Sequence, residues 1–242
     1  MRGFAHVGAL KAMNELGIFP DIISGVSAGA IVGALYADNY KPDEIISIFL
    51  EKKLFGYFKL HMSKKGLLKM TGIIRILSQK LRSKTFDDLQ IPFIVSATNL
   101  NKGTTEFFRS GELLNRLIAS ASIPVVFPPV IMNGKAYVDG GVLNNFPVEP
   151  LQRNCKLIIG ININPTEELE DFTNLLGIAE RSFHLGLTCY MAGKGKKCNI
   201  FIEPKGLEKF KLFDMSKATE IFELGYSETK RILKENMHLI PK

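Results

Sequence analysis

The 242-residue sequence predicts an α/β protein with a mainly parallel central sheet and helices on both of its faces. Strand-like apolar segments alternate with helical patterns along the whole chain. The segment KLIIGINI at residues 156–163 is apolar almost throughout, as expected for a strand that is buried on both faces. No linker-like stretch divides the chain, so we expect a single domain over residues 1–242.

The first half of the chain supplies most of the expected strands. Apolar residues recur at helical spacing up to Leu16, and Gly17 is a natural helix stop. Pro42 is followed by two acidic residues, which favours a helix start. Turn residues at 101–103 predict a hairpin. The expected elements are a helix at 6–16, a strand at 21–25, a helix at 28–39, a helix opening at Pro42, a strand at 91–100 and its hairpin partner at 104–108.

The second half alternates in the same way. Three prolines, Pro124, Pro128 and Pro129, predict an extended loop. A short strand that follows ends in Asp139 and two glycines. The expected elements are a helix at 112–120, strands at 135–139 and 156–163, a helix at 175–191, a strand at 199–203 and a closing helix at 216–234.

The net charge of +7 is concentrated in residues 51–84. Ten lysines and arginines lie there, and Glu51 is the only acidic residue. Aromatic and aliphatic residues are interleaved with them, and this combination suits an anionic lipid surface. We therefore expect a lid-like insertion that contacts a membrane peripherally, with a solvated face over ordinary core contacts as the alternative. No helix-turn-helix, zinc or RNA-binding signature accompanies the charge, so nucleic acid is not an expected partner.

Cysteines and the N-terminus bear on the cellular compartment. Cys155, Cys189 and Cys198 form an odd, widely spaced set without a C-x-x-C pair, which favours a reducing compartment over a disulfide framework or a zinc site. No signal peptide is recognisable, and the apolar run at 22–37 is shorter than the roughly 20 residues that a bilayer needs. We expect a cytoplasmic protein.

Ser27 is the first candidate for chemistry. It stands in Gly25-Val26-Ser27-Ala28-Gly29, a G-x-S-x-G sequence between the expected strand and helix. In a nucleophile elbow of this kind a sharp turn exposes the serine hydroxyl, and the following helix directs its free N–H groups at a developing oxyanion. The alternative is a serine that only caps the helix.

A serine nucleophile needs a group that accepts its proton. Of the four histidines, His6, His61, His184 and His238, only His184 follows the elbow at a suitable place, and it lies in a helical pattern typical of a structural histidine. Asp139 in YVDGGVLNNFPV is the more prominent candidate, because Gly140 and Gly141 after it allow a tight loop. A simple aspartate-initiated turn is its alternative.

Together these motifs resemble the patatin-like phospholipase family. The resemblance covers most of the chain and rests on the segments RGFAHVGALKAMNELGI, DIISGVSAGAIVGALYA, ASASIPVVFPPV, YVDGGVLNNFPV and IFELGYSETKRIL. It implies a three-layer α/β/α fold and a Ser–Asp dyad without histidine, in which Ser27 is the nucleophile and Asp139 its partner. It further implies cleavage of acyl esters of phospholipids, lysophospholipids or related lipids through an acyl-enzyme, with no metal or organic cofactor.

One motif departs from the family pattern. Members carry a G-G-G-x-R-G-type loop whose N–H groups form the oxyanion hole, and here only Arg2 and Gly3 match its end. The Ala28 N–H is a further expected donor. Since every later motif is intact, we expect the reading frame to begin upstream of Met1. The alternatives are a catalytically weakened lipid-binding protein on the same scaffold and an ordinary triad hydrolase that uses His184.

Overall fold

The computed structural model describes residues 2–51, 70–165, 178, 181–182, 185–186, 191–210 and 216–241. The chain forms two compact units. One contains Asp21–Asn145, and the other combines Met1–Pro20 with Phe146–Lys242.

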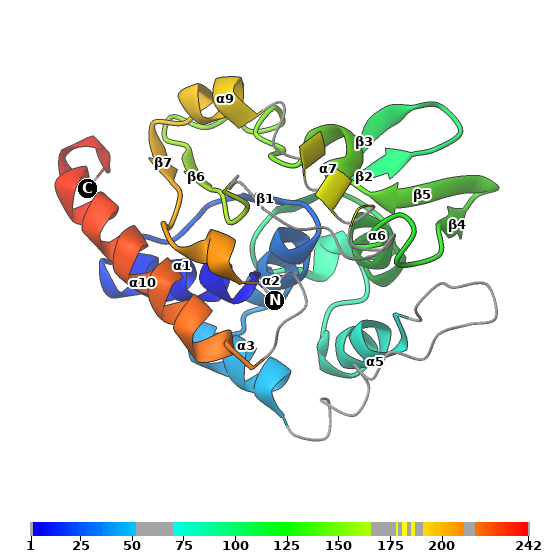
Figure 1. Ribbon diagram of the computed structural model, residues 1–242, viewed down its shortest axis with the longest axis horizontal. Helices are drawn as coiled ribbons and strands as arrows, with labels where there is room; N and C mark the ends of the chain where they lie inside the picture. Colours follow the sequence, from blue (N-terminus) through cyan, green and yellow to red (C-terminus); the bar gives the residue numbers. More distant parts are fainter. Residues whose placement is uncertain are drawn as a thin grey trace. The chain divides into compact units, whose positions relative to one another are not determined.

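The unit Asp21–Asn145 contains a five-stranded sheet, and helices connect several of its strands along the chain (Figure 1). Its elements are β1 (Ile23–Gly25), α2 (Ala28–Ala37), α3 (Pro42–Leu50), α5 (Thr71–Lys80), the 3₁₀ helix η2 (Phe86–Asp88), β2 (Phe93–Asn99), β3 (Thr104–Phe108), α6 (Leu114–Ser120), β4 (Val130–Met132), β5 (Lys135–Asp139) and α7 (Gly141–Asn144).

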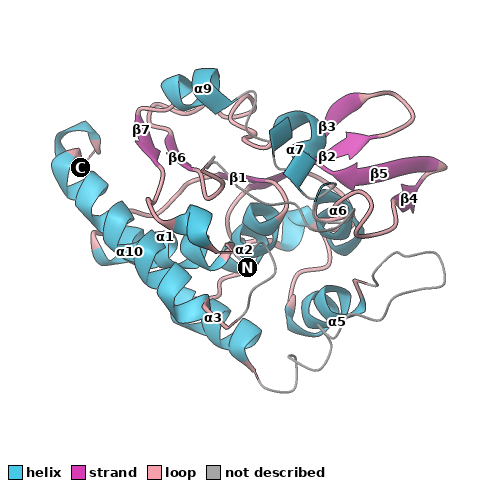
Figure 2. Cartoon of the chain, in the orientation of Figure 1, coloured by secondary structure: helices cyan, strands magenta, loops and turns pink. Residues whose placement is uncertain are grey.

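Strand pairing in this sheet is mixed, and its order is β1-β2-β5-β4 with β3 also paired to β2 (Figure 2). β1 runs parallel to β2, whereas β3 and β5 pair antiparallel with β2 and β4 pairs antiparallel with β5. The predicted parallel pairing is thus limited in this sheet to β1 and β2, because short turns join β2 to β3 and β4 to β5. The predicted hairpin is present, since Asn99 is opposite Thr104 at its turn. The register also places Ala97 opposite Asp139, so the end of β5 lies beside the centre of β2.

β2 forms the centre of this unit's core. All seven of its residues are buried, the apolar ones of its first half and the polar Ser96, Thr98 and Asn99 of its second half alike. α2 packs against β1 and β2, and α6 packs against β2 and β5. Gly33 of α2 allows this close packing, because a Cβ there would lie 2.9 Å from the ring of Phe93. The core therefore holds the ends of β1, β2 and β5 in fixed register.

The other unit contains a parallel strand pair and a pair of long helices. Its elements are α1 (Phe4–Glu15), β6 (Ile159–Ile161), α9 (Met191–Lys194), β7 (Ile200–Ile202), α10 (Ala218–Glu235) and the 3₁₀ helices η3 (Gly195–Lys197), η4 (Leu207–Lys209) and η5 (Met237–Leu239). β6 pairs with β7 in parallel, with Ile159 opposite Ile200.

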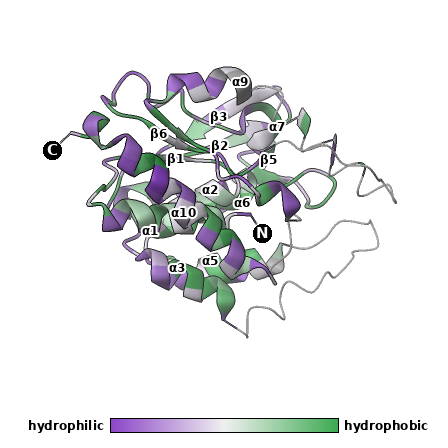
Figure 3. Cartoon of the chain, turned by 60° about the vertical axis from the view of Figure 1, so that its left-hand side comes forward, coloured by the Kyte–Doolittle hydropathy of each residue, from purple (hydrophilic) through white to green (hydrophobic). Residues whose placement is uncertain are grey.

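α1 and α10 lie side by side and nearly touch through two glycines (Figure 1). A Cβ on Gly8 would lie 2.1 Å from the carbonyl oxygen of Phe222, and one on Gly225 would lie 2.1 Å from that of Ala5. Any larger residue at either position would force the helices apart. The buried residues of α10 recur three to four positions apart, and Figure 3 shows hydrophobic and hydrophilic residues alternating along this helix accordingly.

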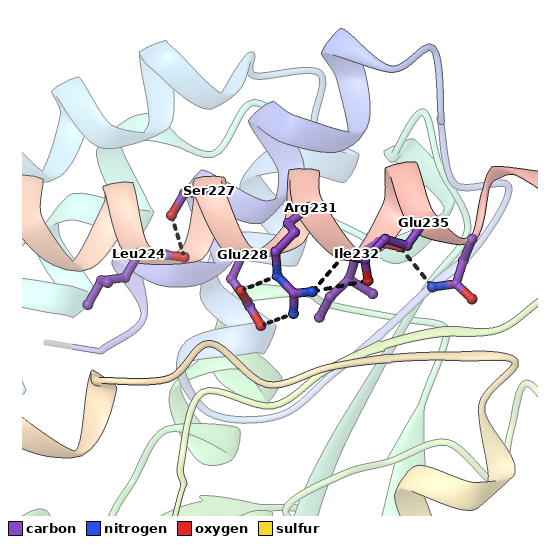
Figure 4. A network of polar contacts seen from close by, with 7 residues as sticks. Leu224, Ser227, Glu228, Arg231, Ile232 and Glu235 are labelled. Atoms are coloured by element: carbon purple, nitrogen blue, oxygen red, sulfur yellow. Dashed lines mark hydrogen bonds and ion pairs between the residues drawn. The ribbon is translucent and has the colours of Figure 1, made fainter.

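The opposite face of α10 carries ion pairs. Arg231 donates to Glu228 at 2.7 Å and to Glu235 at 2.8 Å, so that one guanidinium bridges positions i−3 and i+4 (Figure 4). These groups are partly exposed, so water and salt screen their attraction, and the pairs add little to the stability of the helix. This face of α10 is exposed to solvent.

Most of the described elements agree with the sequence predictions. β3 and β5 have the predicted bounds, and the other predicted strands and helices begin and end within a few residues of expectation. The elements that were not predicted are β4, α5, the short α7, α9 and the 3₁₀ helices. The helix predicted at 175–191 falls mostly outside the described residues, although residues 178, 181–182, 185–186 and 191 are described and are helical. About half of the lid-like insertion also lies outside them, since residues 52–69 are not described.

Candidate active site

Ser27 lies at the junction of β1 and α2 with an unusual backbone conformation. Its φ is 52° and its ψ is −122°, a combination that side-chain-bearing residues avoid. Such conformations persist only where the surrounding structure imposes them, and they concentrate at functional sites. The strand–serine–helix arrangement that the G-x-S-x-G sequence predicts is therefore present.

The Ser27 side chain does not cap the helix. Its hydroxyl makes no capping hydrogen bond, although the Ser27 carbonyl accepts the N–H groups of Ala30 at 3.0 Å and Ile31 at 3.1 Å. This excludes the simple capping role considered for this serine. The Ala28 and Gly29 N–H groups precede these bonds, and the first N–H groups of a helix have no partner within it. They lie at the positive end of α2, next to the hydroxyl.

The tightness of this turn depends on Gly25. A Cβ at Gly25 would lie 2.8 Å from the Gly29 carbonyl oxygen and 2.9 Å from the backbone of Ala30. Contacts this short are not tolerated, so only glycine lets the start of α2 pack onto the end of β1. Steric exclusion of a side chain therefore explains why the first residue of the G-x-S-x-G motif is glycine.

Asp139 ends β5 and is only 1% exposed. Burial raises its pKa to about 7 from the ordinary 3.8, while the nearby Ser27 hydroxyl and the Gly141 N–H, which favour the charged carboxylate, oppose the rise. The Gly141 N–H donates to Oδ1 at 2.8 Å. Oδ2 completes no well-formed hydrogen bond with any described residue, so the Ser27 contact is loose. Catalytic hydrogen bonds are often long until substrate is bound.

Gly140 lets the loop after Asp139 lie against its neighbours. A Cβ on Gly140 would lie 2.4 Å from the Ser96 carbonyl oxygen and 2.8 Å from Cγ2 of Val26. The loop thus contacts both β2 and the residue just before Ser27. The structure brings together Ser27 and Asp139, the two residues that the sequence singles out, within one unit.

Sequence reasoning missed the segment that links these two residues. Oγ of Ser120 accepts the Ser27 N–H at 2.9 Å. The Ser122 carbonyl accepts the Asp139 N–H at 2.9 Å, and the Ser120 carbonyl accepts the Gly140 N–H at 3.4 Å. The only signal for this segment in the sequence is the run Ala-Ser-Ala-Ser that contains Ser120 and Ser122. The hydrogen bond between Ser27 and Ser120 joins residues that are 93 positions apart, so no local spacing predicts it.

A comparison with protein families matches residues 1–151 to the patatin-like phospholipase family. The chain belongs to this family. A solved structure, VipD from Legionella pneumophila, has a similar fold, with a TM-score of 0.56 at 15% identity over 97% of this chain and 65% of that one. The predicted three-layer α/β/α class is thereby confirmed.

Curated relatives of this patatin-like chain include proteins named lysophospholipase NTE1. Those of Kluyveromyces lactis and Eremothecium gossypii are 25% and 27% identical over 93% and 97% of this chain. The one from Saccharomyces cerevisiae is 24% identical over 93% of it. The matches cover only 15–18% of the length of these relatives.

The family's oxyanion loop corresponds here to Arg2 and Gly3, which belong to the unit that does not contain Ser27. Arg2 is 9% exposed, and its guanidinium donates to the Phe210 carbonyl at 3.0 Å and to the Glu208 carbonyl at 3.2 Å. The side chain thus fixes the loop before α1 to the segment around η4. The expected oxyanion role of the loop stays a prediction.

The remaining predicted groups are distributed as follows. His6 and His238 belong to the unit without Ser27, and His61 and His184 lie outside the described residues. Across the described part of the chain, no group of three histidine, cysteine or carboxylate side chains gathers in a way that could hold a metal ion. Within the same residues no helix combines the length and apolar character needed to cross a bilayer.

The ends of the basic insertion are described even though its centre is not. Lys80, the last residue of α5, forms an ion pair of 2.7 Å with Glu51, so the C-terminal end of α5 lies next to the residue that precedes 52–69. Beyond α5, Asp38 accepts the N–H groups of Arg82 at 2.7 Å and Ser83 at 3.1 Å. The insertion therefore starts and ends on the unit that contains Ser27, and its lipid contact stays a prediction.

Proposed function

We propose that the chain is a serine lipid acyl hydrolase in which Ser27 is the nucleophile and Asp139 the base. One observation carries this proposal: an uncapped serine in a strained turn contacts a buried carboxylate whose pKa is raised to about 7. A carboxylate with a pKa near 4 is a feeble base at neutral pH, whereas one near 7 matches the working pH of general-base catalysis. Burial of Asp139 thus supplies the basicity that a histidine provides in other hydrolases.

In the first half-reaction, Ser27 Oγ attacks the acyl carbonyl carbon while Asp139 takes the hydroxyl proton. The tetrahedral intermediate carries its negative charge on the former carbonyl oxygen, where the Ala28 and Gly29 N–H groups and the N-terminal end of α2 stabilise it. The ester C–O bond then breaks, and the leaving alcohol takes the proton from Asp139. The acyl group remains on Ser27.

In the second half-reaction, water replaces the alcohol. The oxygen of this water attacks the acyl carbon while Asp139 takes one of the water's protons. The bond between the acyl carbon and Ser27 Oγ then breaks, and Ser27 Oγ takes the proton back from Asp139. The products are a fatty acid and free enzyme. Asp139 alternates between base and acid in both halves, so no histidine is needed.

The names of the relatives support a lysophospholipid substrate, and the basic insertion at 51–84 supports access to lipid at an anionic surface. The test is release of fatty acid from lysophosphatidylcholine micelles and from diacyl phospholipid vesicles. Wild type should release fatty acid, and Ser27→Ala and Asp139→Asn should lower turnover by orders of magnitude while remaining folded.

Two outcomes would contradict the proposal. Equal turnover in wild type and Ser27→Ala would exclude the nucleophile. Binding of wild type to sedimented vesicles with no fatty acid released from any lipid would instead support the alternative of a lipid-binding protein on the same scaffold.

A further inference from the structure

We propose that Ser120 is a positioning residue, which holds the backbone of Ser27 in its strained conformation through its hydroxyl oxygen; this inference rests on the proposed function. Ser120 is the last residue of α6 and is fully buried. Its Oγ accepts the Ser27 N–H at 2.9 Å, a normal length for a hydrogen bond.

The hydrogen bond from the Ser27 N–H to Ser120 Oγ opposes relaxation of the strained backbone at Ser27. At φ 52° and ψ −122° the serine would relax into a more common region of backbone space unless contacts prevented it. The two peptide groups around Ser27 are held differently. Its carbonyl is fixed by the first turn of α2, through Ala30 and Ile31, whereas its N–H is fixed by Ser120. Removing the Ser120 oxygen frees the N–H side of the turn.

The same segment also holds the second reacting group. The Ser122 carbonyl binds the Asp139 N–H, and the Ser120 carbonyl binds the Gly140 N–H. Residues 120–122 therefore connect the turn that carries the nucleophile to the strand end that carries the base. Of these contacts, the one from the Ser120 hydroxyl is made by a side chain, so substitution can remove it while the backbone contacts remain.

Ser122 provides a matched control. It is also fully buried and loses the same hydroxyl on replacement by alanine. Its Oγ donates to the Ile118 carbonyl at 2.7 Å and contacts Sδ of Met70 at 3.5 Å, so it does not support the turn at Ser27. A general effect of a buried serine on folding appears in both variants, whereas an effect on the nucleophile appears only in Ser120→Ala.

Two readouts separate positioning from folding. The first is kinetic: Ser120→Ala should lower kcat for lysophosphatidylcholine and the rate of Ser27 labelling by a fluorophosphonate by about tenfold, the size of one lost hydrogen bond, with KM unchanged. Ser122→Ala should keep both rates within about twofold of wild type at a similar loss of thermal stability. Ser120→Cys keeps a weak acceptor and a similar volume, so its rates should lie between those of wild type and Ser120→Ala. If Ser120→Ala does not fold, Ser120→Cys replaces it in both measurements.

The second readout is independent of catalysis. Amide hydrogen exchange at Ser27 should accelerate by about tenfold or more in Ser120→Ala and should stay unchanged in Ser122→Ala. Unchanged exchange at Ser27, or equal kinetics in the two alanine variants, would overturn the inference. Normal Ser27 reactivity in Ser120→Ala would overturn only the role of Ser120, whereas a wild-type Ser27 that does not react at all would contradict the proposed function.

Discussion

Replacing Asp139 by asparagine removes a carboxylate that is 1% exposed and keeps an oxygen that can accept the Gly141 N–H. In the folded protein burial raises the pKa of Asp139 to about 7, whereas the unfolded chain has the ordinary value of 3.8. Between these values the folded protein keeps the proton and the unfolded chain releases it. Raising the pH therefore favours the unfolded state over this range, and the loss is complete above about pH 7.

The size of this loss follows from the difference between the two pKa values. Each pKa unit corresponds to about 1.4 kcal/mol, so the wild type loses at most about 4 kcal/mol between pH 4 and pH 7 through Asp139 alone. Asparagine does not titrate, so Asp139→Asn is spared this loss. The free energy of unfolding of the variant minus that of the wild type should therefore increase with pH up to about 7 and then stay constant.

Urea unfolding of both proteins at several pH values between 4 and 8 measures this difference, because contributions from other titrating groups cancel. The variant should gain on the wild type by about 1 kcal/mol per pH unit in the middle of the range, and it should lose hydrolysis at every pH. A difference in unfolding free energy that does not change with pH would refute the claim that Asp139 is a desolvated carboxyl in the folded protein.

Three further predictions concern the same site. The kcat/KM for ester hydrolysis should rise with pH and level off above about 7, because only ionised Asp139 accepts the Ser27 proton and burial raises its pKa; a pH–rate profile that is flat from 5 to 8 would contradict this. Ser27→Gly should be more stable to urea than Ser27→Ala by about 1 kcal/mol, since both lack the hydroxyl but only glycine relieves the positive φ; equal stabilities would show that the turn is not strained. Gly140→Ala should abolish hydrolysis and lower the free energy of unfolding by about 2 kcal/mol or more, because its Cβ would lie 2.4 Å from the Ser96 carbonyl oxygen. The control Gly134→Ala, with φ of 72° and open space around it, should cost about 1 kcal/mol and keep activity; similar activity in the two variants would contradict the steric argument.

Local patterns predicted most of the described elements because their causes are local. The hairpin of β2 and β3 follows from turn residues between two strand-like runs, and α3 begins at Pro42 as its acidic first turn indicates. β4 was missed because its three residues directly follow two prolines, and it exists through antiparallel pairing with β5. α5 is not among the predicted elements because the concentration of positive charge in residues 51–84 predicts a surface feature and does not by itself indicate a helix.

The same distinction applies to the site. Ser27 could be predicted because a G-x-S-x-G sequence between a strand and a helix has a local meaning. The burial of Asp139, which raises its pKa, depends on its position beside Ala97 in the sheet, and no spacing near residue 139 encodes it. The contact from Ser120 is likewise tertiary. The family resemblance predicts Ser27 and Asp139 as the reacting pair, and the structure explains what holds these two residues in place.

The most direct test of the central claim is peptide mapping by mass spectrometry after reaction with a fluorophosphonate. The account predicts a single adduct on the peptide that contains Ser27, formed much faster in wild type than in Asp139→Asn. Absence of the adduct from this peptide, or equal labelling rates in the two proteins, would contradict a nucleophile at Ser27 that is activated by Asp139.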